Sequence, residues 1–267
     1  MEKTKMNQGS PENRALTITI LYDNKPFDER LKTKWGFSAL IENEGHSLLF
    51  DTGGDSPTLL NNMRALGIDP GSIQALLLSH PHEDHTGGVE GVLQENDSLP
   101  VYLLPSFPTA FKRNLSDRTE VIEAQTSQEI TRGMYTTGEM GEEIPEQALV
   151  IRTSQGLLVI TGCAHPGIVN VIRKASDLFK ETVVAALGGF HLKSKRASEI
   201  KGILSEFRQL GVRYAAPSHC TGKRAIALFK KEYKENFIRS GAGKIVQIED
   251  TLRAVDPTQE EIKKEHK

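Results

Sequence analysis

The sequence has few cysteines and lacks any long apolar run. Its two cysteines, Cys163 and Cys220, are too few for the disulfide framework of a small secreted protein. No apolar run approaches the ~20 residues that a membrane-spanning helix needs. The first 15 residues, MEKTKMNQGSPENRA, are polar and lack the apolar centre of a signal peptide. We therefore expect a cytoplasmic protein that does not enter a membrane.

A strong net charge is also absent, because 33 basic side chains are balanced by 35 acidic ones. No overall electric field therefore favours nucleic acid or an anionic membrane surface as a partner, and nothing in the sequence predicts an oligomeric state. Hydrophobic residues make up 37% of the 267 residues, as in ordinary soluble globular proteins. This length is sufficient for a sizeable buried core.

The chain is expected to have three parts. Residues 1–14 and 256–267 are polar or charged, and we predict a flexible N-terminal arm and a charged C-terminal tail. Residues 15–255 are predicted to form a single domain, in which early strand hairpins are followed by alternating strands and helices. This pattern is typical of an α/β protein of the α+β type, with sheets covered by helices. Residues 105–145 have weak periodicity, and we expect them to cover one side of a site.

Histidines follow apolar strands at four places along the chain. LLLS precedes His80, His82, Asp84 and His85; LLVITGCA precedes His165; VVAALGGF precedes His191; and YAAPS precedes His219. Strand ends at one side of a sheet are where α/β folds place their functional sites. The sequence therefore predicts that these side chains meet.

The segment HPHEDH, residues 80–85, has the composition of a metal site. Neutral imidazoles and carboxylates bind Zn²⁺, and also Mn²⁺ or Fe²⁺. His80 and His82 point the same way if the backbone is extended, whereas Asp84 and His85 need a turn to converge. We expect Gly87 and Gly88 to free the backbone just afterwards. One short segment can thus supply ligands to two metal ions about 3.5–4 Å apart.

The two cysteines lie within two residues of a presumed ligand histidine, and two interpretations remain open. A thiolate is a good metal ligand, and alternation directs Cys163 to the same side as His165. Adjacent residues point apart, so Cys220 is expected to point away from His219. We favour small buried apolar side chains for both cysteines, with a disulfide only if the two loops meet closely.

The motif SHPHEDHTGG, together with FDTG at residues 50–53, resembles the H-x-H-x-D-H signature of the metallo-β-lactamase superfamily. Further segments narrow the resemblance: LYDN, GFSALIE, GCAHPGIVN, GGFHL and HCTG. In that order they resemble a subfamily labelled 7,8-dihydropterin-6-methyl-4-(β-D-ribofuranosyl)aminobenzene-5′-phosphate synthase. The resemblance spans about residues 21–248 and implies a four-layer αββα sandwich.

The resemblance also implies a ligand set for two divalent metal ions, Zn²⁺ first, with Mn²⁺ or Fe²⁺ as alternatives. By analogy the first metal would be bound by His80, His82 and His165, and the second by Asp84, His85 and His219. The superfamily usually supplies a bridging Asp after its fourth motif strand. Here TVVAALGGFHL offers no acid and presents His191. His191 is therefore expected to bind a metal or touch substrate, unless solvent alone bridges the pair.

Further residues are expected to support the site. Asp51 is predicted to orient a ligand histidine. The early motifs suggest that Asn24, Trp35 and Phe37 line a substrate pocket, although Trp35 also suits a core position. Thr221 and Lys223, at a predicted helix start, are candidates for holding a phosphate, and an ordinary helix cap with a solvated lysine is the alternative.

Three functions are consistent with these observations. We favour a metal-dependent hydrolase that uses water of lowered pKa, near ~7, on a small, phosphorylated substrate, with Asp84 and His191 taking part in catalysis. No G-x-S-x-G nucleophile motif is present. The second function is the synthase of the subfamily label, which joins a pterin to an aryl ribose phosphate. The third is a ligand sensor that keeps the fold without turnover.

Overall fold

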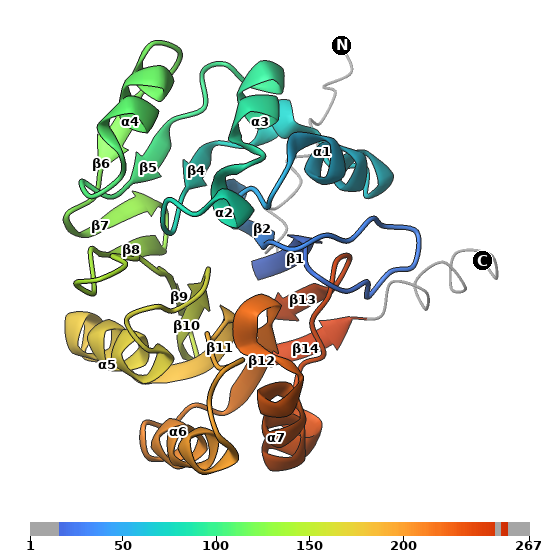
Figure 1. The fold of residues 1–267 in the computed structure, drawn as a ribbon, viewed down its shortest axis with the longest axis vertical. Helices are drawn as coiled ribbons and strands as arrows, with labels where there is room; N and C mark the ends of the chain where they lie inside the picture. The colour runs from blue at the N-terminus through green and yellow to red at the C-terminus, as the bar shows by residue number, and fades with distance from the viewer. Residues whose placement is uncertain (1–15, 249–251, 256–267) are drawn as a thin grey trace, which may run out of the picture.

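Two β-sheets lie face to face at the centre of the protein, and helices cover the outer face of each (Figure 1). The structure, a computed structural model, describes residues 16–248 and 252–255. The predicted arm at 1–14 and the predicted tail at 256–267 lie outside the described residues. The layers form the αββα sandwich that the sequence predicts, so the predicted fold class is confirmed.

The first sheet has the strand order β14-β13-β1-β2-β3-β4-β5-β6. Its strands, in chain order, are β1 (Leu16–Tyr22), β2 (Ser38–Asn43), β3 (His46–Phe50), β4 (Ala75–Leu77), β5 (Val101–Leu103), β6 (Val121–Glu123), β13 (Ile245–Ile248) and β14 (Leu252–Val255). The predicted hairpin is present as β2 and β3, which are antiparallel. Strands β3, β4, β5 and β6 are parallel, so their carboxyl ends lie along one edge.

The second sheet has the strand order β12-β11-β10-β9-β8-β7. Its strands are β7 (Thr126–Thr131), β8 (Met134–Gly138), β9 (Leu149–Thr153), β10 (Gly156–Thr161), β11 (Val183–Gly189) and β12 (Tyr214–Ser218). The pairs β10–β11 and β11–β12 are parallel, and β9 and β10 form an antiparallel hairpin. This sheet therefore also has an edge at which successive parallel strands end together.

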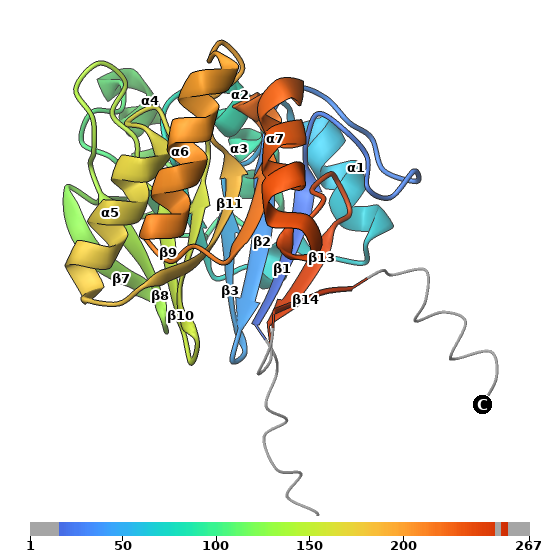
Figure 2. The same ribbon diagram turned by 90° about the horizontal axis from the view of Figure 1, so that it is seen from below.

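Helices flank the two sheets in two groups (Figure 2). They are α1 (Ser56–Ala65), α2 (Glu83–Thr86), α3 (Val89–Glu95), α4 (Thr109–Ser116), α5 (Ile168–Phe179), α6 (Ala197–Gln209) and α7 (Lys223–Tyr233), with short 3₁₀ turns η1 (Pro70–Ser72), η2 (His219–Thr221) and η3 (Lys234–Asn236). Helix α1 has a favourable start: Asp55 Oδ1 accepts the N–H of Thr58, and Pro57 stands in the first turn.

Three apolar clusters fill the spaces between the four layers. The central cluster joins the facing sheets and contains Ile18, Phe50 and Leu158, among others. A second cluster packs α5, α6 and α7 against the second sheet, and a third packs α1 and α3 against the first sheet. Phe37 belongs to the central cluster and is fully buried. Its predicted role in lining a pocket is therefore wrong, and it packs edge-on against Phe50.

Residues 105–145 form more regular structure than their sequence predicts. They contain α4 and three strands, of which β6 ends the first sheet and β7 and β8 extend the second. Edge strands are half exposed, so their apolar pattern is weak and sequence periodicity is a poor guide there. The last strand of the first sheet, β14, pairs antiparallel with β13. Within residues 16–248 and 252–255, no helix is long and apolar enough to cross a bilayer.

Candidate metal centre

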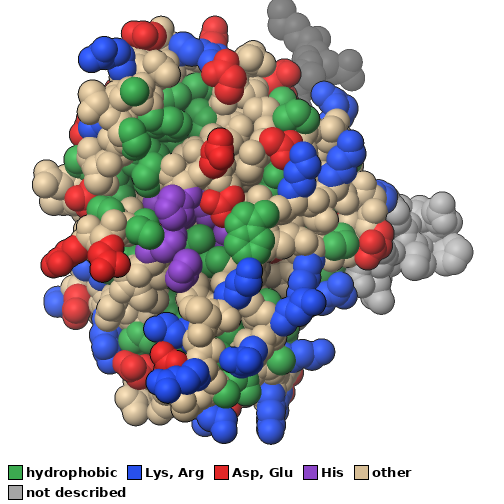
Figure 3. All heavy atoms as spheres, viewed as in Figure 1, with side chains coloured by type: hydrophobic (Ala, Val, Ile, Leu, Met, Phe, Trp, Pro, Cys, Tyr) green, Lys and Arg blue, Asp and Glu red, His purple; other side chains and the backbone are tan. Residues whose placement is uncertain are grey.

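The histidines predicted at strand ends gather where the parallel strands of both sheets end. The segment containing His80 and His85 follows β4 of the first sheet, whereas His165 and His219 follow β10 and β12 of the second. In the space-filling view, a patch of histidines lies near the middle of one face (Figure 3). The facing sheets thus bring together residues that are more than a hundred positions apart in the sequence.

Three histidines form the first group of ligand atoms. One nitrogen each of His80, His82 and His165 lies within 4.8 Å of the others. His80 Nε2 and His82 Nδ1 are 3.1 Å apart. Two nitrogens bound to one tetrahedral Zn²⁺ at 2.0–2.1 Å would be about 3.3 Å apart. The separation of these two nitrogens therefore suits a shared metal ion.

A second group combines the carboxylate of Asp84 with His85 and His219. Asp84 Oδ2 lies 3.2 Å from His219 Nε2 and 3.7 Å from His85 Nε2. The predicted turn that brings Asp84 beside His85 is the single-turn helix α2. His219 Nε2 is buried, and apart from this ion pair with Asp84 it has no hydrogen-bond partner among the described residues. A buried polar atom without a partner is costly, and a cation at this point would remove that cost.

Burial keeps two of the rings in the form that binds metal. Burial is the largest influence on His80 and His85, and it lowers the pKa of each to about 3. Both imidazoles are therefore neutral at pH 7. Burial alone would raise the pKa of the Asp84 carboxyl, but the neighbouring His219 and His85 hold it well below its usual range. Asp84 is thus ionised, as a metal ligand must be.

Asp51 lies directly behind the second group, at the end of β3. Its Oδ2 is 2.7 Å from His85 Nδ1, and its carboxylate also accepts hydrogen bonds from the backbone N–H and the hydroxyl of Ser79. Burial raises the pKa of Asp51 to about 7. A hydrogen bond from His85 Nδ1–H leaves the Nε2 lone pair facing Asp84. This is the contact that the predicted orienting role requires.

Glu146 lies behind the first group, and sequence reasoning missed it. Its Oε1 accepts the N–H groups of Cys163 and Ala164 at 2.8 Å. Its Oε2 accepts the N–H of His165 and lies 2.9 Å from His165 Nδ1. Burial opposes ionisation, but His80, His165 and these N–H groups keep the pKa of Glu146 well below its usual range. Its only signal in the sequence was an acid beside the apolar segment ALVI.

Asn24 and Ser79 hold two further rings. Asn24 Nδ2 donates to the backbone oxygen of His219 at 3.0 Å, and Asn24 Oδ1 lies 3.2 Å from His219 Nδ1. Ser79 Oγ lies 2.9 Å from His80 Nδ1. Four histidines, at positions 80, 85, 165 and 219, therefore have Nδ1 engaged by a neighbour and Nε2 left for the centre.

Gly87 and Gly88, which follow α2, allow close packing and have ordinary backbone angles. Gly87 and Gly88 have φ of −66° and −91°, which any residue adopts. A Cβ at Gly87 would lie 2.3 Å from the backbone oxygen of Gly54, and one at Gly88 would lie 2.3 Å from that of Thr52. The prediction that these glycines free the backbone is therefore wrong, because their role is close packing of α2 against the loop after β3.

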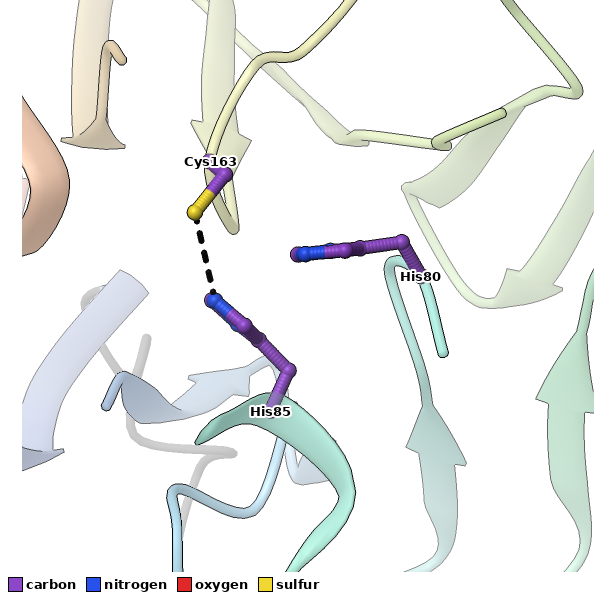
Figure 4. A group of neighbouring side chains, drawn as sticks. All are labelled: His80, His85 and Cys163. Carbon is purple, nitrogen blue, oxygen red and sulfur yellow. Dashed lines mark hydrogen bonds between the residues drawn. The ribbon is translucent and has the colours of Figure 1, made fainter. Parts of the chain in front are cut away.

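Both thiols are buried, as predicted for small apolar side chains, but they also lie among the candidate metal ligands. Both cysteines are free and buried. Cys163 Sγ is 3.4 Å from His85 Nε2, and it forms a third group with His80 and His85 (Figure 4). Cys163, Cys220 and His191 form a fourth. His191 is exposed, and its ring centre lies 4.5 Å from that of His165.

A basic cavity of about 860 Å³ opens beside His219. Its lining includes Asn24 and Trp35, as predicted for a pocket, together with these cationic residues: Lys25, Lys193, Lys223, Lys230, Lys234 and Arg239. Figure 3 shows lysines and arginines beside the histidine patch. Trp35 is half exposed, so the alternative of a core position is excluded. Its ring centre lies 4.8 Å from that of His219, and Lys193 Nζ lies 5.2 Å from it.

Of the two residues predicted to hold a phosphate, only Lys223 lines this cavity. Thr221 is fully buried, and its Oγ1 accepts the N–H of Phe190 at 3.0 Å. Its predicted contact with a phosphate is therefore not supported. A smaller cavity of about 410 Å³ is lined by His191 and Cys220, and it shares Trp35 and Lys193 with the basic cavity. His191 thus lies next to the basic cavity.

The donor atoms at this site suit divalent metal ions of intermediate softness. Imidazole nitrogens, a carboxylate and a thiol favour Zn²⁺ or Fe²⁺ over purely oxygen-binding ions such as Mg²⁺. Among the described residues, the carboxylate of Asp84 pairs with His85 and His219 and not with a lysine or arginine. The fold and these groups together define a protein of the metallo-β-lactamase superfamily.

The chain belongs to this superfamily, whose family model matches residues 36–172. A curated relative from Methanocaldococcus jannaschii is named 7,8-dihydropterin-6-methyl-4-(beta-D-ribofuranosyl)-aminobenzene-5'-phosphate synthase. It is 30% identical, over 91% of this chain and 99% of its own. The resemblance stated from the motifs is therefore confirmed.

Two solved structures share this fold over their whole length. Tm1679, described as a metal-dependent hydrolase of the beta-lactamase superfamily, has a TM-score of 0.75 and 29% identity, and the match covers 88% of this chain and 100% of that one. YhfI from Bacillus subtilis has a TM-score of 0.67 and 14% identity, with the same coverage, and supports the fold alone. The relatives indicate an enzyme and leave its reaction open.

Proposed function

We propose that the protein is a metal-dependent hydrolase acting on a small, phosphorylated substrate. The observation that carries this proposal is the convergence of two groups of three ligand atoms beside a basic cavity. His80, His82 and His165 would hold one Zn²⁺, and Asp84, His85 and His219 the other. When bound, two such ions supply Lewis acidity and lower the pKa of water toward ~7.

The side chains around the two groups have distinct proposed roles. Asp84, with one oxygen facing His219 and His85, would orient the attacking water as well as bind metal. His191 is exposed beside the first group, so its ring would exchange a proton with the substrate or the leaving group. Both residues remain proposed catalytic residues on these grounds.

The basic cavity supports an anionic substrate with a flat part. Lysine ammonium groups bind phosphate as point charges, and six cationic residues line one cavity. Trp35 presents a half-exposed ring between this cavity and His191, where a flat group can stack. A phosphorylated molecule that carries a ring would therefore place its phosphate among the lysines and its ring against Trp35.

Replacing His82 with alanine should abolish turnover. His82 is exposed and supplies a ligand atom without taking part in the buried core, so the variant should fold. On a panel of phosphodiesters, lactones and thioesters, we expect wild-type kcat/KM to exceed that of His82→Ala by at least ~100-fold on one class. His46→Ala, outside the ligand groups of the described residues, is the control. Equal rates for wild type and His82→Ala on every class would exclude the hydrolase.

Replacing Lys223 with alanine should weaken binding of a phosphorylated substrate. Loss of one charge-assisted contact corresponds to ~1.5 kcal/mol, which raises KM about 10-fold with little change in kcat. Lys231→Ala is the matched control, because Lys231 lies on the same helix outside the lining of the cavity. An unchanged KM in Lys223→Ala would remove Lys223 from the substrate site.

The second candidate is the synthase activity named for the relative from Methanocaldococcus jannaschii. The observation that favours it is 30% identity over 91% of the chain. The cavity beside Trp35 would then receive the phosphate and ring of an aminobenzene ribose phosphate. Calorimetric titration with a dihydropterin separates the candidates, because only the synthase requires that the metal-loaded protein bind it. A sensor would bind its ligand and show no turnover in either assay.

A further inference from the structure

The end of β11, where the superfamily usually has a bridging acid, offers no carboxylate, because Gly189 is followed by Phe190 and His191. Gly189 ends β11, and a Cβ built on it would lie 2.2 Å from the backbone oxygen of Gly162. The same Cβ would lie 2.7 Å from Cys220 Sγ. Position 189 therefore cannot carry an acid, and the sulfur atom of Cys220 occupies the adjoining space.

A different side chain lies between the two groups of metal ligands. Cys163 Sγ forms a cluster with His80, which belongs to the first group, and His85, which belongs to the second. All three residues are buried, and the sulfur points toward both rings (Figure 4). Cys163 Sγ lies 3.4 Å from His85 Nε2. A sulfur at 2.3 Å and a nitrogen at 2.0–2.1 Å on one tetrahedral Zn²⁺ would be about 3.5 Å apart.

Cys163 is held in this position by its surroundings. Its backbone N–H donates to Glu146 Oε1 at 2.8 Å, and the next residue, Ala164, donates to the same oxygen. Ala164 has a left-handed φ of 60°, which turns the chain between Cys163 and His165. Cys220 Sγ lies within 4.8 Å of Cys163 Sγ and donates to the Cys163 carbonyl oxygen at 3.6 Å.

We propose that Cys163 is a bridging ligand, whose single sulfur binds both metal ions in place of the missing carboxylate. This inference rests on the proposed two-metal centre. On metal binding, the S–H bond would break, its proton would pass to solvent, and two metal–sulfur bonds would form. Cys220 would be a positioning residue that donates its S–H to the bridging sulfur. A thiolate bridge favours Zn²⁺ or Fe²⁺ over Mn²⁺, because sulfur is a soft ligand.

X-ray absorption at the zinc edge tests this directly on the full-length protein, loaded with two zinc ions and kept in a thiol-free reductant. A bridging sulfur is seen by both ions, so we expect about one sulfur per zinc at about 2.3 Å. A sulfur bound to one ion alone gives an average of about half a sulfur per zinc. Cys220→Ser should leave about one sulfur per zinc, and Cys163→Ser should leave none.

Each outcome decides a separate point. Two zinc ions with about half a sulfur each, or with none, would overturn the bridge while leaving the metal centre intact. About one sulfur per zinc that falls to half in Cys220→Ser would mean two terminal thiolates and would also overturn it. Failure to bind zinc would overturn the metal centre itself, and the bridge with it. If Cys163→Ser does not fold, the wild type and Cys220→Ser still decide between bridge and terminal ligands.

Discussion

Replacing Glu146 with alanine is expected to cause one of the two largest losses in this protein. Three backbone N–H groups and His165 Nδ1 would lose their buried acceptor. Each buried donor left without a partner costs ~1–3 kcal/mol, and relief from burying a charge offsets part of the sum. We expect the free energy of unfolding to fall by ~3–5 kcal/mol, measured by urea denaturation of the metal-free protein.

The Glu146→Gln variant separates the contribution of Glu146 to stability from its contribution to zinc affinity. An amide oxygen can still accept the N–H groups of Cys163 and Ala164, but the amide nitrogen would face His165 Nδ1–H and could not accept from it. We expect a smaller loss of stability and a ~10–100-fold loss of zinc affinity. Glu143→Ala, an exposed acid on the same loop, is the control. A Glu146→Ala variant within ~1 kcal/mol of wild type would contradict the assigned contacts.

The pH dependence of this contribution follows from the pKa of Glu146. The folded state lowers this pKa, so the carboxylate contributes stability above the ordinary value near 4.5. That contribution declines as the pH falls below this value, because protonation is easier in the unfolded chain. The difference in stability between wild type and Glu146→Gln should therefore narrow as the protein is acidified.

Loading the protein with zinc should produce the second large effect, an increase in melting temperature. A ligand at 1,000 times its Kd that binds only the folded state stabilises it by ~4 kcal/mol. For a chain of this size the shift is ~8–16 °C. Elemental analysis of protein purified without added metal accompanies the thermal scan. We expect His82→Ala to show a smaller shift, because one ion loses a ligand.

The control for the zinc experiment is His46→Ala, since His46 lies in the β2–β3 hairpin. It should melt like the wild type with and without zinc. Less than about half an equivalent of bound metal, together with no gain in melting temperature on adding Zn²⁺, Mn²⁺ or Fe²⁺, would exclude a metal centre altogether.

The sequence was sufficient for most of the fold because its central strands are apolar and end in marked turns. The hairpin of β2 and β3 and the start of α1 at Asp55 follow from local rules that need no tertiary information. Residues 105–145 were harder, because β6 and β7 are short edge strands whose mixed side chains carry no clear period.

Some residues of the candidate site could likewise be predicted from the sequence, and others could not. The positions of His80, His165 and His219 at strand ends could be anticipated, because parallel strands of one sheet end together. The position of Glu146 could not, since its role depends on a loop nearly twenty residues later. Trp35 lines the cavity as predicted, whereas Phe37, two residues later in the same motif, is buried in the core. Spacing along the chain does not determine which side faces the core.

Each ligand group takes residues from both sheets, so bound metal ions would affect how the protein unfolds. His80 and His82 come from the first sheet and His165 from the second, while Asp84 and His85 come from the first and His219 from the second. Two bound ions would therefore act as cross-links between the halves of the sandwich. The sheets could not separate without releasing both metals, so unfolding of the loaded protein would be slow, and chelators would accelerate it.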